Sequence, residues 1–317
     1  MDKEMDKLNF IDQKEIENWF FKNQEIFGTT IYSSIDIRYS GQKIAPVDTN
    51  LFPAGFNNLR EEETKEASSA AKDFFKKNFG KIKSIGIIVE DHTRNINYFR
   101  NLYSLKKIFE LTEIDFRFIS LTHKERIIIE EPGLELIILP AQIISDYLVS
   151  EGHNFDVLVS NNDFSEGIPD KLDKVKQPIV PKLCSGWFNR KKSDHLSLYA
   201  KTLQEFCDFF SLNPFFFSAQ YKNCGEINFK EKLGLDCVAN SVDKMIFKLR
   251  KEYIEYGISQ DPYVFIKAER GTYGMGITTV NSGKEIYDMN KKIRNKMDVI
   301  KGGNKNTEVE FKKEYLQ

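Results

Sequence analysis

Four residues in the last quarter of the chain, one lysine and three glycines, have the types and spacing of a phosphate-binding loop. Lys267 ends an apolar, strand-like run, and Gly271, Gly274 and Gly276 follow it as Gly-x-x-Gly-x-Gly. Glycines let backbone N–H groups approach an anion closely, because no Cβ stands in the way. The lysine adds a compact positive charge. The pattern therefore predicts that this segment binds the phosphates of a nucleotide.

The residues after the glycines indicate which kind of phosphate loop this is. A P-loop or a Rossmann turn opens into a helix, whereas Ile277–Val280 is rich in β-branched residues and typical of a strand. The Gly-Lys-Ser/Thr ending of a P-loop is also absent from this segment. We therefore expect a hairpin that closes over ATP, with Thr272, Tyr273 and Met275 between its glycines.

A second candidate site lies in a polar stretch near the N-terminus. Alternating apolar residues over 35–39 predict a strand, and a turn at 40–41 leads to a second strand through Ile44. Side chains beyond it offer donors and acceptors to a zwitterionic ligand; they are Asp48, Asn50, Asn57 and Asn58. Arg38 could bind a carboxylate through two hydrogen bonds. The alternative is that Asp and Asn cap their own backbone in Asx turns.

A third polar segment directly follows the apolar run 155–160. In open parallel sheets, ligands bind beyond the carboxyl ends of the strands, so Asn162 and Asp163 are well placed to contact a substrate. A surface turn would have a similar composition, and both interpretations stay open.

A fourth segment is basic. Arg190, Lys191 and Lys192 could bind phosphate or carboxylate, although a run of charges is more often a solvated face. His195 follows them and is expected near the start of a helix. No arrangement for nucleophilic catalysis is visible around it.

The remaining elements must position these segments. Apolar residues at helical spacing predict helices, which cover 12–27, 61–79, about 95–110, 141–150, 194–211 and 241–256, the last capped by Ser241 and Gly257. Short apolar runs predict strands at 84–89, 116–121, 126–129, 134–139 and 155–160. Strands that alternate with helices indicate an α/β fold with a largely parallel sheet. Turn residues at 178–181 predict a boundary between domains 1–180 and 181–317.

Composition describes an ordinary globular protein. The 317 residues are 41% hydrophobic and 29% charged, and the formal net charge of −1 favours neither nucleic acid nor an anionic membrane as a partner. No apolar run is long enough to span a bilayer, and the N-terminus does not resemble a signal peptide. The four cysteines lack zinc spacing, so we expect reduced, mostly buried thiols in a cytoplasmic protein.

Taken together, the four segments resemble one family. The run 45–59, Ala-Pro-Val-Asp-Thr-Asn-Leu-Phe-Pro-Ala-Gly-Phe-Asn-Asn-Leu, is similar to the hallmark of the proteobacterial glutamate–cysteine ligases with an ATP-grasp-like fold. Four further stretches follow the order of matching stretches in that family: 161–163, 167–169, Gly186-Trp187 with 190–193, and 267–277. The resemblance extends over most of the chain.

The resemblance implies both a fold and an activity. It implies an α/β substrate-binding domain over 1–180 and an incomplete ATP-grasp-like α+β nucleotide-binding domain over 181–317. With ATP and Mg²⁺, such a ligase phosphorylates the side-chain carboxylate of glutamate, and the amine of cysteine then displaces the phosphate. The product, γ-glutamylcysteine, is the first intermediate of glutathione biosynthesis.

The resemblance also assigns roles to the candidate residues. Lys267 and Arg190 would be catalytic. Lys267 would bind ATP phosphates together with Gly271, Thr272, Tyr273, Gly274, Met275 and Gly276. The substrate residues would be Arg38, Asp48, Asn50, Asn57, Asn58, Asn162 and Asp163.

One departure from the family pattern lies after Val280. ATP-grasp enzymes place the adenine hinge, a ribose-binding acid and the Mg²⁺ ligands there, whereas residues 281–317 predict one helix and a strand at 308–311. We therefore expect a C-terminally truncated or split protein, with a separate fragment in trans to complete it, and we assign no metal ligand within this chain. The alternatives are an inactive remnant that binds nucleotide or amino acid, and another carboxylate–amine ligase on the same scaffold.

Overall fold

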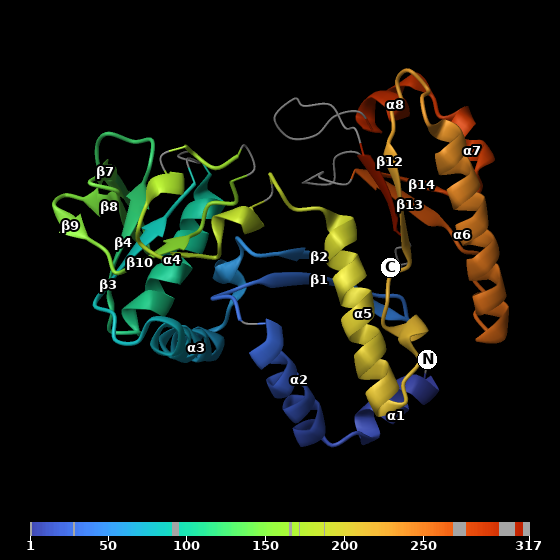
Figure 1. Ribbon diagram of the computed structural model, residues 1–317, viewed down its shortest axis with the longest axis horizontal. Coiled ribbons are helices and arrows are strands. Elements are labelled where there is room, and N and C mark those ends of the chain that lie inside the picture. The colour runs from blue at the N-terminus through green and yellow to red at the C-terminus, as the bar shows by residue number, and fades with distance from the viewer. Residues whose placement is uncertain are drawn as a thin grey trace. The chain divides into compact units, whose positions relative to one another are not determined.

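Two compact units make up the chain in the computed structural model, which describes residues 2–27, 29–90, 95–164, 167–170, 172–186, 188–268, 277–297 and 308–312 (Figure 1). Unit 1 consists of Met1–Ile26, Ile35–Thr49 and Arg190–Gln317, and unit 2 consists of Phe27–Ser34 and Asn50–Asn189. The C-terminal segment of unit 1 begins ten residues after the predicted boundary at 180. The units also differ from the predicted domains because two N-terminal segments group with the C-terminal part.

Unit 2 is built on a six-stranded sheet in the order β11-β10-β3-β4-β6-β5. Its strands are β3 (Ser84–Ile88), β4 (Asp115–Ser120), β5 (Ile127–Glu131), β6 (Leu134–Pro140), β10 (Val157–Ser160) and β11 (Ile179–Val180). All neighbours pair in parallel except β5, which runs antiparallel to β6. Every residue of the central strand β3 is buried, as expected for a parallel strand covered on both faces. The predicted α/β fold with a largely parallel sheet is confirmed.

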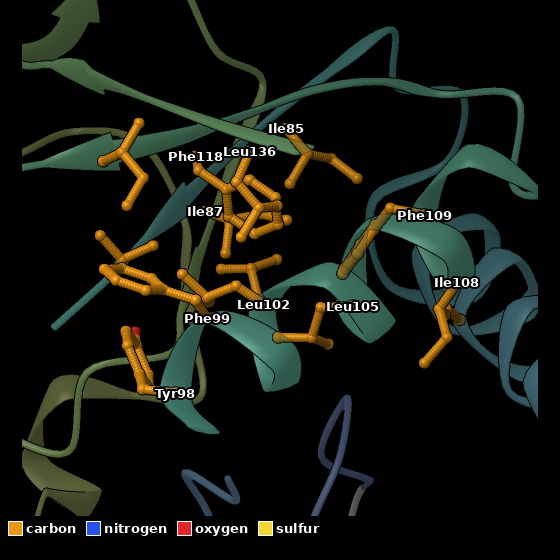
Figure 2. Packing of buried hydrophobic residues seen from close by; sticks show 14 of the residues in the cluster. Ile85, Ile87, Tyr98, Phe99, Leu102, Leu105, Ile108, Phe109, Phe118 and Leu136 are labelled. Carbon is orange, nitrogen blue, oxygen red and sulfur yellow. The ribbon is translucent and has the colours of Figure 1, made fainter. Parts of the chain in front are cut away.

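Helix α4 (Ile96–Glu110) packs its apolar face on this sheet, beside α3 (Glu61–Phe79). Figure 2 shows the contact between helix and strands, formed by Tyr98, Phe99, Leu102, Leu105, Ile85, Ile87, Phe118 and Leu136. The helical residues recur at spacings of three and four, which places them on one face. The Asn95 side chain caps the helix by accepting from the backbone N–H groups of Asn97 and Tyr98.

The helix predicted over 141–150 is wrong. The segment forms the hairpin of β7 (Gln142–Ile144) and β8 (Tyr147–Ser150), extended by β9 (His153–Asn154). The two turn residues, Ser145 and Asp146, have φ values of 51° and 67°. Positive φ at both central positions defines the turn that matches the twist of a two-residue hairpin. Pairs of adjacent apolar residues on either side of this turn imitate helical spacing.

In the part of unit 1 that the structure describes, there are a hairpin, an antiparallel sheet and six α-helices. The hairpin is β1 (Ser34–Tyr39) and β2 (Ile44–Asn50); the sheet has the order β12-β15-β13-β14, with bounds Tyr221–Glu226, Glu308–Lys312, Val264–Ala268 and Ile277–Val280. The helices are α1 (Asp2–Phe10), α2 (Gln13–Phe27), α5 (Lys192–Phe210), α6 (Leu235–Glu255), α7 (Lys284–Asp288) and α8 (Lys291–Met297). Short 3-10 helices lie at Phe56–Asn58, Leu172–Lys174 and Leu183–Ser185 in unit 2, and at Pro214–Phe216 in unit 1.

Helix α6 provides the main support of the antiparallel sheet. Val238, Val242 and Ile246 on one of its faces join a buried cluster with Val264 and Ile266 of β13. Its predicted start at Ser241 is wrong, because the helix begins at Leu235 after Gly234. The Ser241 hydroxyl is instead hydrogen-bonded to the Cys224 thiol of β12, at 3.2 Å between Oγ and Sγ.

The prediction that the cysteines are mostly buried is also wrong. Cys207 is buried, whereas Cys184 and Cys237 are exposed. All four cysteines have free thiols. Among the described helices, none combines the length and the apolar content needed to cross a bilayer.

Replacing Gly283 by alanine is expected to destabilise the protein. Gly283 precedes α7, and a Cβ there would lie 2.5 Å from the carbonyl oxygen of Ala239 and 2.5 Å from Oδ2 of Asp243, both on α6. The Ala239 carbonyl belongs to helix backbone and cannot rotate away. We expect Gly283→Ala to lower the free energy of unfolding by about 1–3 kcal/mol, measured by urea denaturation. Lys284→Ala, at the exposed neighbouring position, should change it by no more than about 0.5 kcal/mol. Equal stability of the two variants would contradict the predicted overlap.

Candidate nucleotide and substrate sites

The predicted phosphate-binding lysine lies in an antiparallel hairpin. Strands β13 and β14 pair from Val264 opposite Val280 to Lys267 opposite Ile277. The prediction that a strand follows the glycines is therefore confirmed. The predicted phosphate-binding residues Gly271, Thr272, Tyr273, Gly274, Met275 and Gly276 lie outside the described residues, and their role stays a prediction.

Lys267 is held firmly at the end of its strand. Successive side chains of a strand point to opposite faces, so Lys267 and Phe265 share the face opposite Val264 and Ile266. The last two are fully buried in the cluster with α6. The Lys267 side chain is also largely buried, and its Nζ lies 5.6 Å from the centre of the Phe265 ring. An ammonium group with a packed stem at a strand end suits the binding of an anion.

A largely buried charged cluster in unit 1 joins two of the predicted segments. Nη2 of Arg190 lies 3.7 Å from Oδ1 of Asp48, and Nζ of Lys192 lies 3.9 Å from Oδ2 of the same carboxylate. The Arg190 guanidinium also donates to the carbonyl oxygen and the hydroxyl of Thr49. The side chains of Arg190 and Lys192 are 12% and 8% exposed, whereas that of Asp48 is 33% exposed.

This arrangement comes directly from the local structure. Strand β2 carries Asp48 and Thr49, and Arg190 and Lys192 stand where the chain enters α5. Arg190 and Asp48, which were predicted from separate segments, are therefore neighbours. The sequence identifies Lys192 only as one member of a charge run, because nothing local indicates that a lysine at the first residue of a helix is buried.

Asx-turn geometry holds two of the predicted asparagines. Oδ1 of Asn50 accepts from the Phe52 N–H at 2.8 Å, and its Nδ2 donates to the Phe52 carbonyl at 3.1 Å. Oδ1 of Asn162 likewise accepts from the Phe164 N–H at 2.9 Å. These contacts favour the Asx-turn alternative for both residues. A substrate role for either one stays a prediction.

The other predicted substrate residues are more accessible. Asn57 and Asn58 lie exposed on a 3-10 helix, with Nδ2 of the first 3.5 Å from Oδ1 of the second. Asp163 is half-buried, and its carbonyl oxygen would lie 3.2 Å from a Cβ at Gly186, so the third and fourth segments meet there. Arg38 is exposed on β1.

A buried polar network positions the segment after β2. The sequence alone did not predict it. Oδ1 of Asn101, which is 1% exposed, accepts from the backbone N–H groups of Gly55 and Phe56 at 2.7 and 3.1 Å. Nδ2 of Asn101 donates to Oδ1 of Asn161 at 3.4 Å, and Nδ2 of Asn161 donates to the Pro53 carbonyl at 3.2 Å. The network ties α4 and the end of β10 to the residues that lead into Asn57 and Asn58. Its one sequence signal is an asparagine inside the apolar face of α4.

Two tyrosines extend this network in unit 2. The Tyr98 hydroxyl accepts from the Glu90 N–H at 2.8 Å and lies 3.4 Å from Oδ1 of Asn161. The Tyr32 hydroxyl donates to the carbonyl oxygen of Ser160. Burial raises the pKa of Tyr32 far above its usual value, so its hydroxyl remains a neutral donor.

No cluster of acidic, histidine or cysteine side chains marks a metal site among the described residues. They include no group of three or more His, Cys, Asp or Glu residues arranged to hold an ion. The Asp48 carboxylate faces two cationic side chains instead. Mg²⁺ at a nucleotide site is usually held by one or two carboxylates together with the phosphates of the nucleotide, so the described side chains identify no ligand for it.

Comparison with known proteins gives a family and a similar solved structure. Residues 7–312 match the family described as GshA, glutamate-cysteine ligase. The crystal structure of a candidate gamma-glutamylcysteine synthetase from Methylobacillus flagellatus KT has a TM-score of 0.88 and 36% sequence identity, and the match covers 95% of this chain and 72% of that chain.

A second solved structure shows a much weaker likeness. D-alanyl-alanine synthetase A from Vibrio cholerae O1 biovar eltor str. N16961 has a TM-score of 0.34 and 13% identity over 74% of this chain and 60% of its own, which is too weak a likeness to use. The comparison with curated proteins gave no match.

Proposed function

The chain belongs to the glutamate–cysteine ligase family, and on that premise we propose that it uses ATP to join glutamate and cysteine into γ-glutamylcysteine. The position of Lys267 is the observation that best supports this function. It is held opposite Ile277 at the end of an antiparallel hairpin, where the glycine-rich segment connects the two strands. This is the strand–lysine–glycine loop–strand order expected of a hairpin that covers ATP.

In this reaction, Lys267 would stabilise negative charge during phosphoryl transfer. The γ-carboxylate of glutamate attacks the terminal phosphorus of ATP. The bond between that phosphorus and the bridging oxygen breaks, and ADP leaves. Negative charge is spread over the transferred phosphoryl oxygens during this step, and a fixed ammonium group stabilises it. The amine of cysteine then attacks the acyl phosphate, expels phosphate and loses a proton. No covalent bond to the protein is required.

The cluster of Asp48, Arg190 and Lys192 suits an amino-acid substrate. A zwitterionic amino acid presents a carboxylate and an ammonium group, and the cluster offers both cationic donors and a carboxylate. The hydrogen bonds from Arg190 to Thr49 fix the guanidinium, which limits the entropy lost when a ligand binds. We assign Arg190 and Lys192 to a substrate carboxylate. A substrate role for Asn57 and Asn58, which lie in unit 2, stays a separate prediction. We leave Arg38 outside this site.

Mg²⁺ is the usual companion of ATP in phosphoryl transfer, where it neutralises phosphate charge. Because no cluster of three or more His, Cys, Asp or Glu side chains marks its site among the described residues, we assign no step to it and no residue of this chain as its ligand. The expectation that a separate C-terminal fragment completes the site also stays a prediction.

Turnover of ATP that requires both amino acids is the test of this function. Purified protein with ATP and Mg²⁺ should release ADP at a rate that depends on glutamate and on cysteine, and mass spectrometry should detect γ-glutamylcysteine. Binding of ATP without turnover would indicate the inactive remnant. Turnover with another amine in place of cysteine, and none with cysteine, would indicate a different carboxylate–amine ligase.

A further inference from the structure

Strand β1 is an exposed sheet edge. It pairs with β2 alone among the described strands, and each of its six residues is exposed. Ile35, Ile37 and Tyr39 follow each other on one face and are 54%, 56% and 55% exposed. Proline and charged side chains, lysine above all, commonly protect an edge from pairing with another chain. The strand contains no proline and no lysine, and its two charged residues, Asp36 and Arg38, have opposite signs. An apolar edge of this kind is suited to adding a strand.

The sequence of this edge is complementary to itself. Residues 34–40 read Ser-Ile-Asp-Ile-Arg-Tyr-Ser. When two copies pair antiparallel about Ile37, Asp36 stands opposite Arg38 of the other copy, and Ile35 stands opposite Tyr39. Opposite residues share a face of the sheet, so the apolar residues gather on one face and two acid–base pairs form on the other. Among the described residues, Asp36 and Arg38 make no ion pair within their own chain.

The backbone supports the same register. Across the turn, the Ser40 N–H donates to the Lys43 carbonyl at 3.0 Å, so Ser40 directs its backbone groups toward β2. The direction alternates along a strand, which leaves the N–H and C=O groups of Tyr39, Ile37 and Ile35 directed away from β2. In the self-paired register these residues exchange hydrogen bonds with the second copy. Asp36 and Arg38 then form the non-hydrogen-bonded pairs, in which side chains lie closest.

We propose that β1 is a dimerisation edge that pairs antiparallel with β1 of a second copy, centred on Ile37. The pairing makes one four-stranded sheet from two hairpins, in the order β2-β1-β1-β2. Charge complementarity favours a second copy in this register, because in-register parallel pairing, or an antiparallel pairing shifted by two residues, would place like charges opposite each other. The proposal assigns Arg38 a role that is independent of the proposed ligase function. The sheet also carries Asp48 and Thr49 on β2, so the pairing would stiffen the strand that holds Arg190.

Sedimentation over a concentration series tests the edge. The native chain is expected to form a dimer, and Ile37→Lys, which places two lysines opposite each other, is expected to shift the protein to a single chain. Ile254→Lys makes the same change at an isoleucine of α6 that is 82% exposed, and should leave the dimer intact. A native chain that stays monomeric, or a dimer that survives Ile37→Lys, would overturn the proposal.

A charge exchange tests the pairing of Asp36 with Arg38. Asp36→Arg or Arg38→Asp alone places like charges opposite each other in both pairs, and each is expected to weaken the dimer by about tenfold. The double variant D36R/R38D restores opposite charges and should recover the native dissociation constant. Single variants without effect, or a double variant weaker than both, would exclude this register.

Cysteine cross-linking tests the register directly. Ile37 faces its own counterpart with Cα atoms about 5.5 Å apart in a hydrogen-bonded pair, which a disulfide can span. Ile37→Cys should therefore form cross-linked dimers under mild oxidation. Ile35→Cys would lie about 14 Å from its counterpart and should give no more cross-linking than the native chain, which has the same exposed Cys184 and Cys237. The reverse result, or equal cross-linking of both variants, would show a different contact.

Discussion

Replacement of Lys267 by methionine is expected to lower ATP-dependent turnover by about 100- to 1,000-fold, the loss typical of removing one preorganised donor to a charged transition state. The residue is 8% exposed, and its stem lies on the same strand face as Phe265. Methionine keeps most of that apolar stem, so the variant removes the charge without leaving a large cavity. The measurement is the rate of ADP release at saturating glutamate and cysteine.

A matched control shows whether the effect depends on the position of the lysine and not only on the loss of a positive charge. Lys222→Met makes the same change on β12 of the same sheet, where the lysine is exposed, and should leave turnover unchanged. Nucleotide binding gives a second measurement, because the rise in melting temperature with ATP should be smaller for Lys267→Met than for Lys222→Met. Equal turnover and equal nucleotide stabilisation in both variants would remove Lys267 from the proposed site.

Replacement of Asn101 by leucine is expected to lower the free energy of unfolding by about 2–4 kcal/mol. Its amide oxygen accepts from two backbone N–H groups, those of Gly55 and Phe56, and its amide nitrogen donates to Asn161. Leucine has a similar size but no polar atom, so these groups lose their partner. Urea denaturation with an unchanged slope would measure the loss.

Hydrogen exchange gives this prediction a local signature. The amides of Gly55 and Phe56 should exchange faster in Asn101→Leu, because the interaction that protects them is gone. Asn97→Leu changes an exposed asparagine one turn earlier on α4 and should alter stability by no more than about 0.5 kcal/mol. Unchanged exchange at Gly55 would mean that another interaction holds this segment.

The elements with strong periodicity could be predicted from the sequence. Residues 61–79 form α3 over those bounds, and the buried runs around β3, β4 and β6 became neighbouring strands, because apolar spacing and glycine stops are local signals. The hairpin at β7 and β8 was missed, since Ser145 and Asp146 adopt a turn that usually contains glycine. Helix α6 was started too late, because a serine in its interior resembles a cap.

The candidate site was only partly predictable, because its geometry depends on contacts between distant segments. Asp48 and Arg190 were chosen by residue type and by the family resemblance, yet no local pattern places a carboxylate of β2 beside a guanidinium so far along the chain. Asn101 is a clearer case. An asparagine on an apolar helix face signals a buried partner, but only the fold shows that the partner is the backbone at Gly55 and Phe56.

The interleaving of the two units along the chain has a consequence for biosynthesis. Residues 35–49 emerge from the ribosome long before Arg190 and the rest of unit 1, and all of Asn50–Asn189 is translated in the interval. Domains generally fold as units as they are made. All segments of unit 2 are present once Asn189 has emerged. At that point the strand that carries Asp48 still lacks Arg190 and Lys192, which are translated later. The charged cluster is therefore among the last features to assemble on the nascent chain.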